Sequence, residues 1–428
     1  DLRLRARMRG LVNGIVQIDQ FEAARVEVVL KRREPPPPSE PAFLPRFVEV
    51  SAPAVRLGEI GLTLQDGQRV EVASLRAALA VTRWRIDLTE LVIDDPAGHV
   101  EGDLRLRARQ PLGLRTALNG HWRLPDERTY RFAARVKGKL DRLGIDASLT
   151  EPARLAFSGT GLDLNHEARA VGTLRAVEFD GSPWIPAGRL PLVSGSLSVD
   201  ARRDAIGVSG TLTSPMFGAE QVRVRGSGTY AEQVLDVVSL KAWMPRSGLT
   251  VSTAGTVRFA EHAPVLDLKG DWTKFRWPLS GDAFVESATG KYSLAGGLPY
   301  AFELAAQAVG PQIPAATFTA AGSIDRQQLL LGRFDGTTLD GRLSGSGRLS
   351  WDGDRPWRAQ LNGRSLDLAK LRPDLSGRVD VIGDIEGRGF EVTAPWTARL
   401  AKLSGTLYGR PLTGSAEIAY RDGTFESK

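Results

Sequence analysis

The sequence predicts an all-β protein in which one long sheet continues from end to end, as in a solenoid. Three observations support this fold class. Apolar and polar residues alternate with a period of two along most of the chain, which is the pattern of half-buried strands. Gly is frequent, at 46 of 428 residues, and many Val, Leu and Thr residues accompany it, which favours strands joined by tight turns. Finally, a pattern of strands recurs along the chain, as in repeat proteins.

The alternation begins in residues 2–10, where four apolar residues and four arginines fall on opposite faces of an extended segment. One face carries Leu2, Leu4, Ala6 and Met8, and the other carries Arg3, Arg5, Arg7 and Arg9. A helix would distribute these arginines around its surface, so the segment is predicted to be a strand. Later segments repeat the pattern, with these residues on the apolar face: Val100, Leu104 and Leu106; Val222 and Val224; Val251, Val257 and Phe259; Leu339, Leu343, Leu349 and Trp351; Val379, Val381 and Ile385; Ile418 and Tyr420.

The chain is predicted to consist of a leading β segment at residues 1–34, a Pro-rich linker at 35–45 and a continuous repeat-like β region at 46–428. Four consecutive prolines, Pro35 to Pro38, should be extended and cannot join a central strand. The best helix signal runs from Asp367 to Leu371, with Asp367 as the N-cap and Pro373 beyond, and it is long enough for little more than one turn. Asp-Gly pairs predict hairpin turns at 66–67, 180–181, 335–336, 352–353 and 422–423.

The recurring pattern places glycines at corresponding points of two segments. Gly255-Thr-Val-Arg-Phe259, Lys269-Gly270 and Leu279-Ser-Gly281 recur as Gly347-Arg-Leu-Ser-Trp351, Asn362-Gly363 and Leu375-Ser-Gly377. Several of these strand glycines have the parity of the apolar residues, as Gly102 has with Leu104 and Gly255 with Val257. Two interpretations stay open: the missing side chains leave room on the apolar face, or the glycines mark bulges and relieve strand twist.

Composition and motifs predict no catalytic site, no metal site and no cofactor. The 56 basic and 50 acidic residues nearly balance, and they alternate along the strands. The basic residues are not clustered in one patch, so no nucleic-acid partner is predicted. The chain has no Cys, which excludes disulfides and thiolate ligands. Its four histidines, His99, His121, His166 and His262, show no metal-ligand spacing and are expected at the surface or in turns. The nine Trp residues lie mostly near predicted strand ends, where core packing or anchoring of a rim is expected.

Several segments resemble the TamB family, which belongs to the AsmA-like superfamily of bridge-like lipid transfer proteins. The resemblance rests on the repeated Gly-x-Leu/Val-x-hydrophobic strands and on these segments: Leu11-Val-Asn-Gly-Ile-Val-Gln-Ile-Asp-Gln-Phe21, Ser344-Gly-Ser-Gly-Arg-Leu-Ser-Trp351 with Pro356-Trp357 and Leu361-Asn-Gly363, and Leu403-Ser-Gly-Thr-Leu-Tyr-Gly-Arg-Pro-Leu-Thr-Gly414. It covers nearly the whole chain.

The resemblance implies a sheet curled into a U-shaped, taco-like groove with an apolar concave face. It implies a periplasmic protein that is anchored to the inner membrane through a segment preceding Asp1, and that meets an outer-membrane Omp85-type barrel, TamA-like, through regions outside this sequence. The implied function is carriage of phospholipid between the inner and outer membranes, in support of outer-membrane assembly. An open sheet of this size must curl or cover one face, and acyl chains on the apolar face would meet that need.

The residues expected to line the lipid groove are Val100, Leu104, Leu106, Val251, Val257, Phe259, Leu339, Leu343, Leu349 and Trp351. Arg3, Arg5, Arg7 and Arg9 form a basic strip that is a candidate for contact with anionic headgroups near an inner-membrane anchor, or else the solvated outer face of one strand.

Two alternatives from other classes of protein stay open. A folding scaffold would hold the strands of outer-membrane β-barrels and autotransporters at its sheet edges or in its groove, together with the Omp85-type partner. A structural all-β surface protein would instead pack its apolar face into a closed, dry solenoid. Small residues and glycine on the apolar face suit an occupied groove, whereas uniformly large residues suit a self-filled core.

Overall fold

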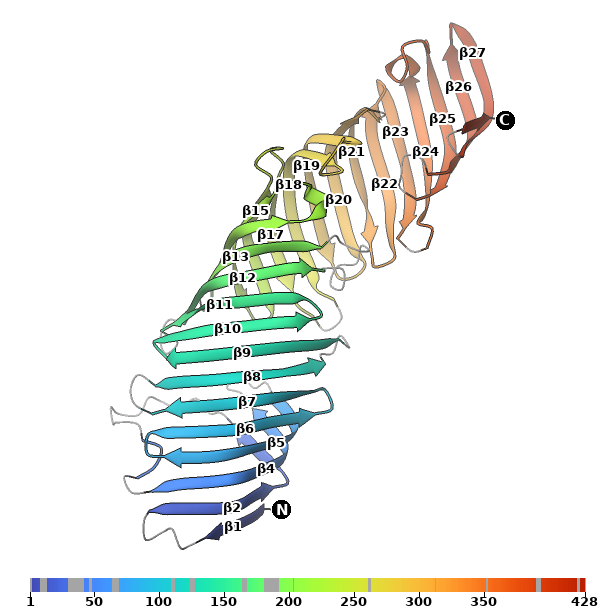
Figure 1. Cartoon of the computed structure of the whole chain (residues 1–428). Helices are drawn as coiled ribbons and strands as arrows, with labels where there is room; N and C mark the ends of the chain where they lie inside the picture. Colours follow the sequence, from blue (N-terminus) through green and yellow to red (C-terminus); the bar gives the residue numbers. More distant parts are fainter. Residues whose placement is uncertain are drawn as a thin grey trace. The chain divides into compact units, whose positions relative to one another are not determined.

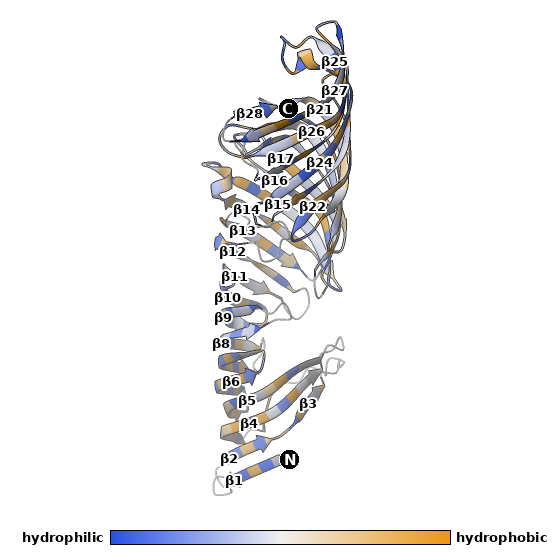
Figure 2. Cartoon of the chain, turned by 90° about the vertical axis from the view of Figure 1, so that its right-hand side faces the viewer, coloured by the Kyte–Doolittle hydropathy of each residue, from blue (hydrophilic) through white to orange (hydrophobic). Residues whose placement is uncertain are grey.

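The computed structural model describes residues 2–7, 14–29, 42–45, 48–63, 69–108, 112–123, 128–163, 168–180, 192–202, 204–260, 263–311, 313–351, 353–389, 394–421 and 424–427. More than half of the chain lies in strands. The helical elements in the described part are two short 3-10 helices, η2 (Pro215–Phe217) and η3 (Leu368–Lys370). The all-β fold class predicted from the alternation is therefore confirmed, and within each unit the sheet is curled and open (Figures 1 and 2).

The chain divides into two compact units, which are described separately. Unit 1 comprises Asp1–Glu178 and Ser196–Arg203. Its strands, in chain order, are β1 (Leu2–Arg7), β2 (Ile15–Ala23), β3 (Val26–Val29), β4 (Glu49–Thr63), β5 (Arg69–Thr82), β6 (Arg85–Asp95), β7 (Gly98–Arg107), β8 (Gly113–Arg123), β9 (Thr129–Lys139), β10 (Arg142–Glu151), β11 (Arg154–Leu162) and β12 (Arg169–Phe179). The residues of β13 (Val193–Arg202) are shared between the two units.

Unit 2 comprises Phe179–Gly195 and Asp204–Lys428. Its strands are β14 (Ile206–Thr213), β15 (Val222–Ala231), β16 (Val234–Trp243), β17 (Thr250–Arg258), β18 (Val265–Trp277), β19 (Val285–Gly296), β20 (Tyr300–Gly310), β21 (Ile313–Ile324), β22 (Gln328–Thr338), β23 (Gly341–Ser350), β24 (Pro356–Asp367), β25 (Gly377–Arg388), β26 (Trp396–Leu407), β27 (Arg410–Arg421) and β28 (Thr424–Ser427).

Unit 1 begins with parallel pairing and continues as an antiparallel meander. β1 pairs with β2, and β2 and β3 then pair in parallel with successive parts of β4. From β4 to β12 each strand pairs antiparallel with the next. The described strands of the leading segment therefore belong to the same sheet as β4. The linker expected at 35–45 lies outside the described residues except for 42–45, so its role as a boundary stays a prediction.

Unit 2 is an antiparallel meander throughout, because each strand from β14 to β28 pairs with the next one in the chain. Many of these pairs contain a shift of register, which is the mark of a β-bulge and bends the strand locally. Figure 2 shows hydrophobic and hydrophilic residues alternating along the strands.

The short helix predicted at residues 367–371 is confirmed as η3. The Asp367 carboxylate accepts a hydrogen bond from the Ala369 N–H at 3.1 Å, as an N-cap side chain does. The hairpin turn predicted at Asp335-Gly336 is wrong, because both residues pair within β22.

The turn between β22 and β23 is formed by Leu339 and Asp340 instead, each with a φ of +51°. Positive φ at both central residues is the conformation of a two-residue hairpin turn, which Asp-Gly and Asn-Gly normally mark in a sequence.

Candidate functional site

The apolar residues of unit 1 form one continuous face from strand to strand. Val100, Leu104 and Leu106 lie on β7, and residues directly opposite each other on antiparallel strands point to the same side of a sheet. Their partners on the neighbouring strands are apolar, or are glycine and threonine: Ile93, Leu88 and Ile86 on β6, and Gly120, Thr116 and Leu114 on β8. The register continues this face through β9, β10, β11 and β12, where it includes Val136, Ile145, Phe157 and Leu174.

In unit 2, one cross-strand row joins two of the sets of residues expected to line the groove. The row runs from β17 to β23 through Val251, Trp272, Gly290, Ala306, Phe318, Gly336 and Leu343. Val251 and Leu343 therefore lie on the same face of the sheet. Val257 on β17 and Leu349 on β23 share that face by their strand parity.

Three of the expected lining residues lie outside strands. Leu339 is in the β22–β23 turn, so the strand position that alternation assigns to it is wrong. Phe259 follows the last residue of β17, is 47% exposed, and lies 6.2 Å from the Tyr230 ring, centroid to centroid. Trp351 follows β23 and donates a hydrogen bond from its indole Nε1 to the Asp325 carbonyl at 3.3 Å.

The apolar faces are only half-buried, although the chain is long enough to bury a large core. Among the described residues, Met244 is the large side chain that is fully buried. Of the expected lining residues Val100 is buried, at 9% exposure, whereas Leu104, Leu106, Val257, Leu343 and Leu349 keep partial exposure. A dry core would bury such residues almost completely, so these faces leave apolar surface accessible.

One part of the apolar face in unit 2 is covered by the chain itself. Val222, Met244 and Leu249 form a buried cluster, and Phe217 of η2 and the groove residue Val251 pack against it. Met244 and Leu249 belong to the β16–β17 connection, in which the Met244 N–H donates to the Leu249 carbonyl at 2.9 Å. The sequence gives no periodic signal for this cluster, because its central residues come from a connection.

Aromatic rings lie over glycines on the apolar face of β18 and β19. A Cβ atom added at Gly290 would lie 2.0 Å from the Trp272 ring, and one added at Gly270 would lie 2.5 Å from the Tyr292 ring. The two rings stack with centroids 6.2 Å apart. The polar atoms of both rings are satisfied, because Trp272 Nε1 donates to Ser287 Oγ at 3.0 Å and the Tyr292 hydroxyl pairs with Thr253 Oγ1.

The glycines at Gly102 and Gly255 follow the bulge interpretation and leave no room. An added Cβ would lie 2.0 Å from the Ala117 carbonyl oxygen at Gly102, and 2.0 Å from the Asp267 carbonyl oxygen at Gly255. Both glycines pair beside a shift of register. They therefore permit close approach of neighbouring backbones and a positive φ, +155° and +132° respectively.

A hollow of about 1010 Å³ crosses β18 to β24 of unit 2. Its lining includes Trp272, Phe318 and Leu343 of the row that joins Val251 to Leu343. It also includes charged residues at the alternate positions of the same strands, which are Asp271, Lys291, Asp335 and Arg342. Leu343 has a glycine on each side in the sheet, Gly336 on β22 and Gly363 on β24, so its side chain stands between two positions without side chains.

Of the four arginines expected to contact headgroups, three lie in β1: Arg3, Arg5 and Arg7. Arg3 and Arg5 are exposed and stand opposite Glu22 and Gln20 of β2. Arg7 ends β1, and Arg9 lies outside the described residues. The Glu22 carboxylate also lies 3.4 Å from the Arg56 guanidinium, so an acid partly balances this strip.

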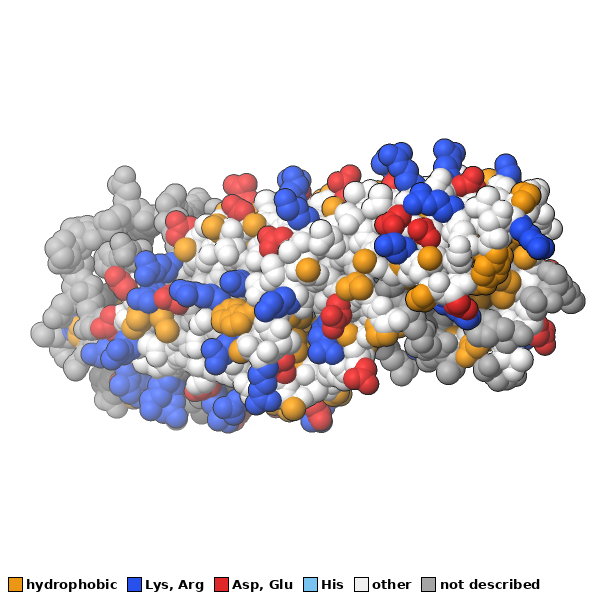
Figure 3. Space-filling model, turned by 90° about the horizontal axis from the view of Figure 1, so that it is seen from above, with side chains coloured by type: hydrophobic (Ala, Val, Ile, Leu, Met, Phe, Trp, Pro, Cys, Tyr) orange, Lys and Arg blue, Asp and Glu red, His pale blue; other side chains and the backbone are white. Residues whose placement is uncertain are grey.

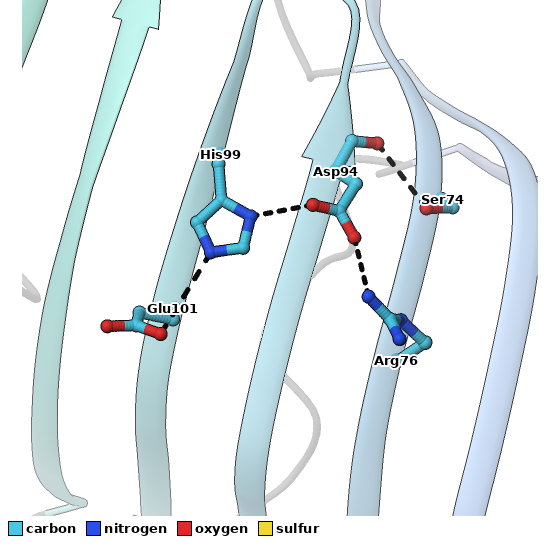
Figure 4. A network of polar contacts seen from close by, with 5 residues as sticks. All are labelled: Ser74, Arg76, Asp94, His99 and Glu101. Atoms are coloured by element: carbon cyan, nitrogen blue, oxygen red, sulfur yellow. Dashed lines mark hydrogen bonds and ion pairs between the residues drawn. The ribbon is translucent and has the colours of Figure 1, made fainter.

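Two histidines that the sequence leaves isolated are neighbours in the sheet. His99 of β7 and His121 of β8 stand directly opposite each other, with ring centroids 6.2 Å apart. Figure 4 shows His99 Nδ1 at 2.6 Å from the Asp94 carboxylate, which also accepts a hydrogen bond from Arg76 at 2.8 Å. The hydrogen bond with His99, and secondly that with Arg76, lowers the pKa of Asp94.

Both histidines lie in strands, where His121 is exposed, as the surface position predicted for it requires, and His99 is half-buried. His166 and His262 lie outside the described residues. No group of three or more His, Asp or Glu side chains in the described ranges is arranged to hold a metal ion. No described helix is long and apolar enough to cross a lipid bilayer.

Both units are therefore open, curled β-sheets with a continuous and accessible apolar face, which is the architecture of a β-groove protein. Residues 233–426, which lie within unit 2, match the family model described as TamB, N-terminal domain. This match supports membership of the TamB family. No solved structure matches the chain.

The match supports a TamB-type role in outer-membrane assembly. TamB-type proteins take part in outer-membrane assembly, and the family is one of structural and transport proteins, without known enzymes. Its members are membrane-anchored periplasmic proteins that associate with a TamA-type partner.

Proposed function

We propose that the apolar faces bind the acyl chains of phospholipid, and that the protein carries phospholipid along them between the inner and outer membranes. The observation that carries this proposal is the unbroken apolar row from Val251 to Leu343, whose large side chains stay accessible. Acyl chains would remove this surface from water without requiring a second protein layer.

The charged residues on the other face of the sheet also support binding of acyl chains to the apolar face. Side chains on the opposite side of the strands include Asp271, Lys291, Asp335 and Arg342, which would be costly to place against hydrocarbon. In Figure 3 basic and acidic side chains are interspersed, with hydrophobic side chains scattered among them, on the face seen from above. Acyl chains therefore have one suitable face in each unit.

Leu343→Asp tests the proposal. Leu343 stands between Gly336 and Gly363, so a carboxylate at this position can be hydrated if the face is open. We expect a folded variant, by circular dichroism and thermal unfolding, that has lost phospholipid measured by native mass spectrometry. In a dry core the same change would bury an unpaired carboxylate at a cost of several kcal/mol and unfold the unit.

Leu330→Asp is the matched control. Leu330 lies on the neighbouring strand β22, is 47% exposed, and stands opposite Ser323 and Arg348 on the polar face. The control should fold and keep its phospholipid. If Leu343→Asp folds and retains phospholipid as the wild type does, the apolar row is not the lipid path. If it unfolds while the control stays folded, the face is a packed core and the structural solenoid is the better account.

A further inference from the structure

Five basic side chains on the polar face of unit 1 have no ion pair or hydrogen bond within the part of the chain that the structure describes. They are Arg107 on β7, Arg115 on β8, Lys137 and Lys139 on β9, and Arg142 on β10. All five are exposed. Together they are called the basic margin here.

The register places like charges of the basic margin directly opposite each other. Arg115 pairs with Lys137, and Lys139 pairs with Arg142. Like charges at directly opposed positions of an antiparallel sheet destabilise it. The fold alone gains nothing from this arrangement, which suggests that an anion compensates the charges.

The nearest carboxylates on the neighbouring strands are engaged elsewhere. Asp87 binds both Arg85 and Arg105, and Asp146 accepts a hydrogen bond from Ser158 at 2.7 Å. Asp103 accepts one from the Glu90 N–H at 3.3 Å. Asp141, in the turn between Lys139 and Arg142, is the acid closest in sequence, and a single carboxylate cannot neutralise five cations.

The basic margin lies at one end of its strands, beside the apolar face. Arg107 and Lys139 are the last residues of β7 and β9, and Arg142 is the first residue of β10. Four neighbouring strands span about 14 Å, so the five cations occupy a compact area. Leu106 and Leu114 are half-buried apolar-face residues at the same strand ends, whereas Leu143 beside them is buried. Cations and accessible hydrocarbon therefore meet along one border of the sheet.

The opposite ends of these strands are different. There Arg131 lies 3.5 Å from the Glu151 carboxylate, and His99 lies 2.6 Å from Asp94. In unit 2, Arg333, Arg358 and Arg399 each have a carboxylate within 4 Å. In unit 2, like charges also stand opposite each other without a described ion pair, at Arg225 and Lys241 and at Arg342 and Arg364. This border of unit 1 is distinguished by five such cations that gather beside the apolar face.

We propose that the basic margin holds the phosphate of phospholipid headgroups whose acyl chains lie on the adjoining apolar face of unit 1. Guanidinium and ammonium groups donate charge-assisted hydrogen bonds to phosphate oxygens, and their long apolar stems let the charged ends reach around a border of the sheet. This inference rests on the proposed function, and it assigns headgroup contact to residues other than the arginines of β1.

The test is a triple variant, Arg115→Gln, Lys137→Gln and Lys139→Gln, in the whole chain. Binding of phosphatidylglycerol, of diacylglycerol with the same acyl chains, and of inorganic phosphate is measured at low salt. We expect the wild type to prefer phosphatidylglycerol, and the variant to bind it roughly tenfold more weakly, because it lacks three cations that attract the anionic headgroup, each of them screened by solvent. Binding of diacylglycerol should not change.

A charge-matched control replaces Arg333, Arg358 and Arg399 by Gln in unit 2, where each is ion-paired, and should leave the preference for phosphatidylglycerol intact. The inference is overturned if the triple variant binds phosphatidylglycerol as the wild type does, or if it loses both lipids equally. It is also overturned if only inorganic phosphate binding is lost, which would indicate a site for free anions. A wild type that binds diacylglycerol and phosphatidylglycerol equally would refute this inference alone, whereas a wild type that binds neither lipid would refute the proposed function.

Discussion

The strands of unit 1 from β7 to β12 and the strands of unit 2 differ in how regularly they pair. From β7 to β12 the register is continuous except at the end of the β9–β10 pair. In unit 2, shifts of register occur in most pairs, including β16–β17, β21–β22, β22–β23 and β25–β26. Each shift inserts a bulge, which bends the strand and increases its twist.

Because of this difference, the alternating pattern in the sequence predicts the face of a residue correctly in some strands and not in others. From the second residue of β8 and of β9, half-buried and exposed residues alternate without a break, and the large apolar residues Leu114, Leu118 and Trp122 all lie on the half-buried side. In β22, Leu331 and Phe334 are three residues apart but pair with Gly347 and Gly345 on the same face. A bulge therefore converts a spacing of two into a spacing of three, and simple parity fails across it.

Two glycine substitutions should have the largest effect and should show whether the two units unfold separately. In Gly102→Ala of unit 1 and Gly255→Ala of unit 2, the new Cβ would lie 2.0 Å from a backbone carbonyl oxygen, at a positive φ. Backbone cannot yield as a side chain can, so each change should lower the free energy of unfolding by about 3 kcal/mol or more. Chemical denaturation measures the loss, and hydrogen exchange resolved by segment assigns it to a unit.

Gly144→Ala and Gly332→Ala are the matched controls in units 1 and 2. The added Cβ would be 3.4 Å and 3.6 Å from the nearest atom, so both variants should keep nearly the wild-type stability. If Gly102→Ala raises exchange only in unit 1 and Gly255→Ala only in unit 2, the units are separate cooperative regions. If either variant raises hydrogen exchange equally in both units, the two units unfold together as one cooperative region.

Much of the fold could be predicted from the sequence because alternation survives wherever a strand has no bulge. Val100, Leu104 and Leu106 lie on one face of β7 as expected, and the short helix at Asp367 follows from its cap. Leu339 could not be placed, because its turn is made by a leucine and an aspartate in a conformation usually marked by glycine.

The remaining features of the site depend on pairing between distant segments. Gly290 and Trp272 carry no mutual signal in the sequence, and only the β18–β19 register puts the ring over the glycine. The basic margin likewise arises because hairpins bring Arg115 opposite Lys137 and Lys139 opposite Arg142. The overall charge, which is nearly balanced, hides this local excess.

Gly290→Ala should have an intermediate effect on stability, and it tests whether the Trp272 ring packs over Gly290 in unit 2. The new Cβ would lie 2.0 Å from the Trp272 ring, which must then tilt away from the sheet and strain its hydrogen bond with Ser287. Overpacking of this kind costs about 1–3 kcal/mol. Tryptophan fluorescence should change with the stability. In Gly414→Ala nothing lies within 4 Å of the new Cβ, so this control should change neither quantity. Unaltered fluorescence and stability in Gly290→Ala would mean that the ring does not rest on Gly290.

The smallest effect concerns two aspartates whose pKa is lowered by different groups. In unit 1 the pKa of Asp94 is lowered first by the His99 side chain and then by Arg76, whereas in unit 2 the pKa of Asp325 is lowered first by the backbone N–H of Gln327. A side chain can be deleted and a backbone N–H cannot. His99→Ala should therefore raise the pKa of Asp94 towards the ordinary value of about 3.9 and leave that of Asp325 unchanged.

The sign of the pH dependence follows from the direction of the shift. A lowered folded-state pKa stabilises the fold at pH values above the ordinary pKa, and the stabilisation is lost as the pH falls through the folded-state value. In His99→Ala this contribution should shrink, so unfolding at acid pH should begin at a slightly higher pH. Carboxyl carbon chemical shifts in an NMR titration measure both pKa values directly.

His121→Ala is the control, because its ring stacks on His99 and makes no described contact with Asp94. An equal rise of the Asp94 pKa in both variants would show that the stacked pair, and not the hydrogen bond with His99, holds the carboxylate in its charged form.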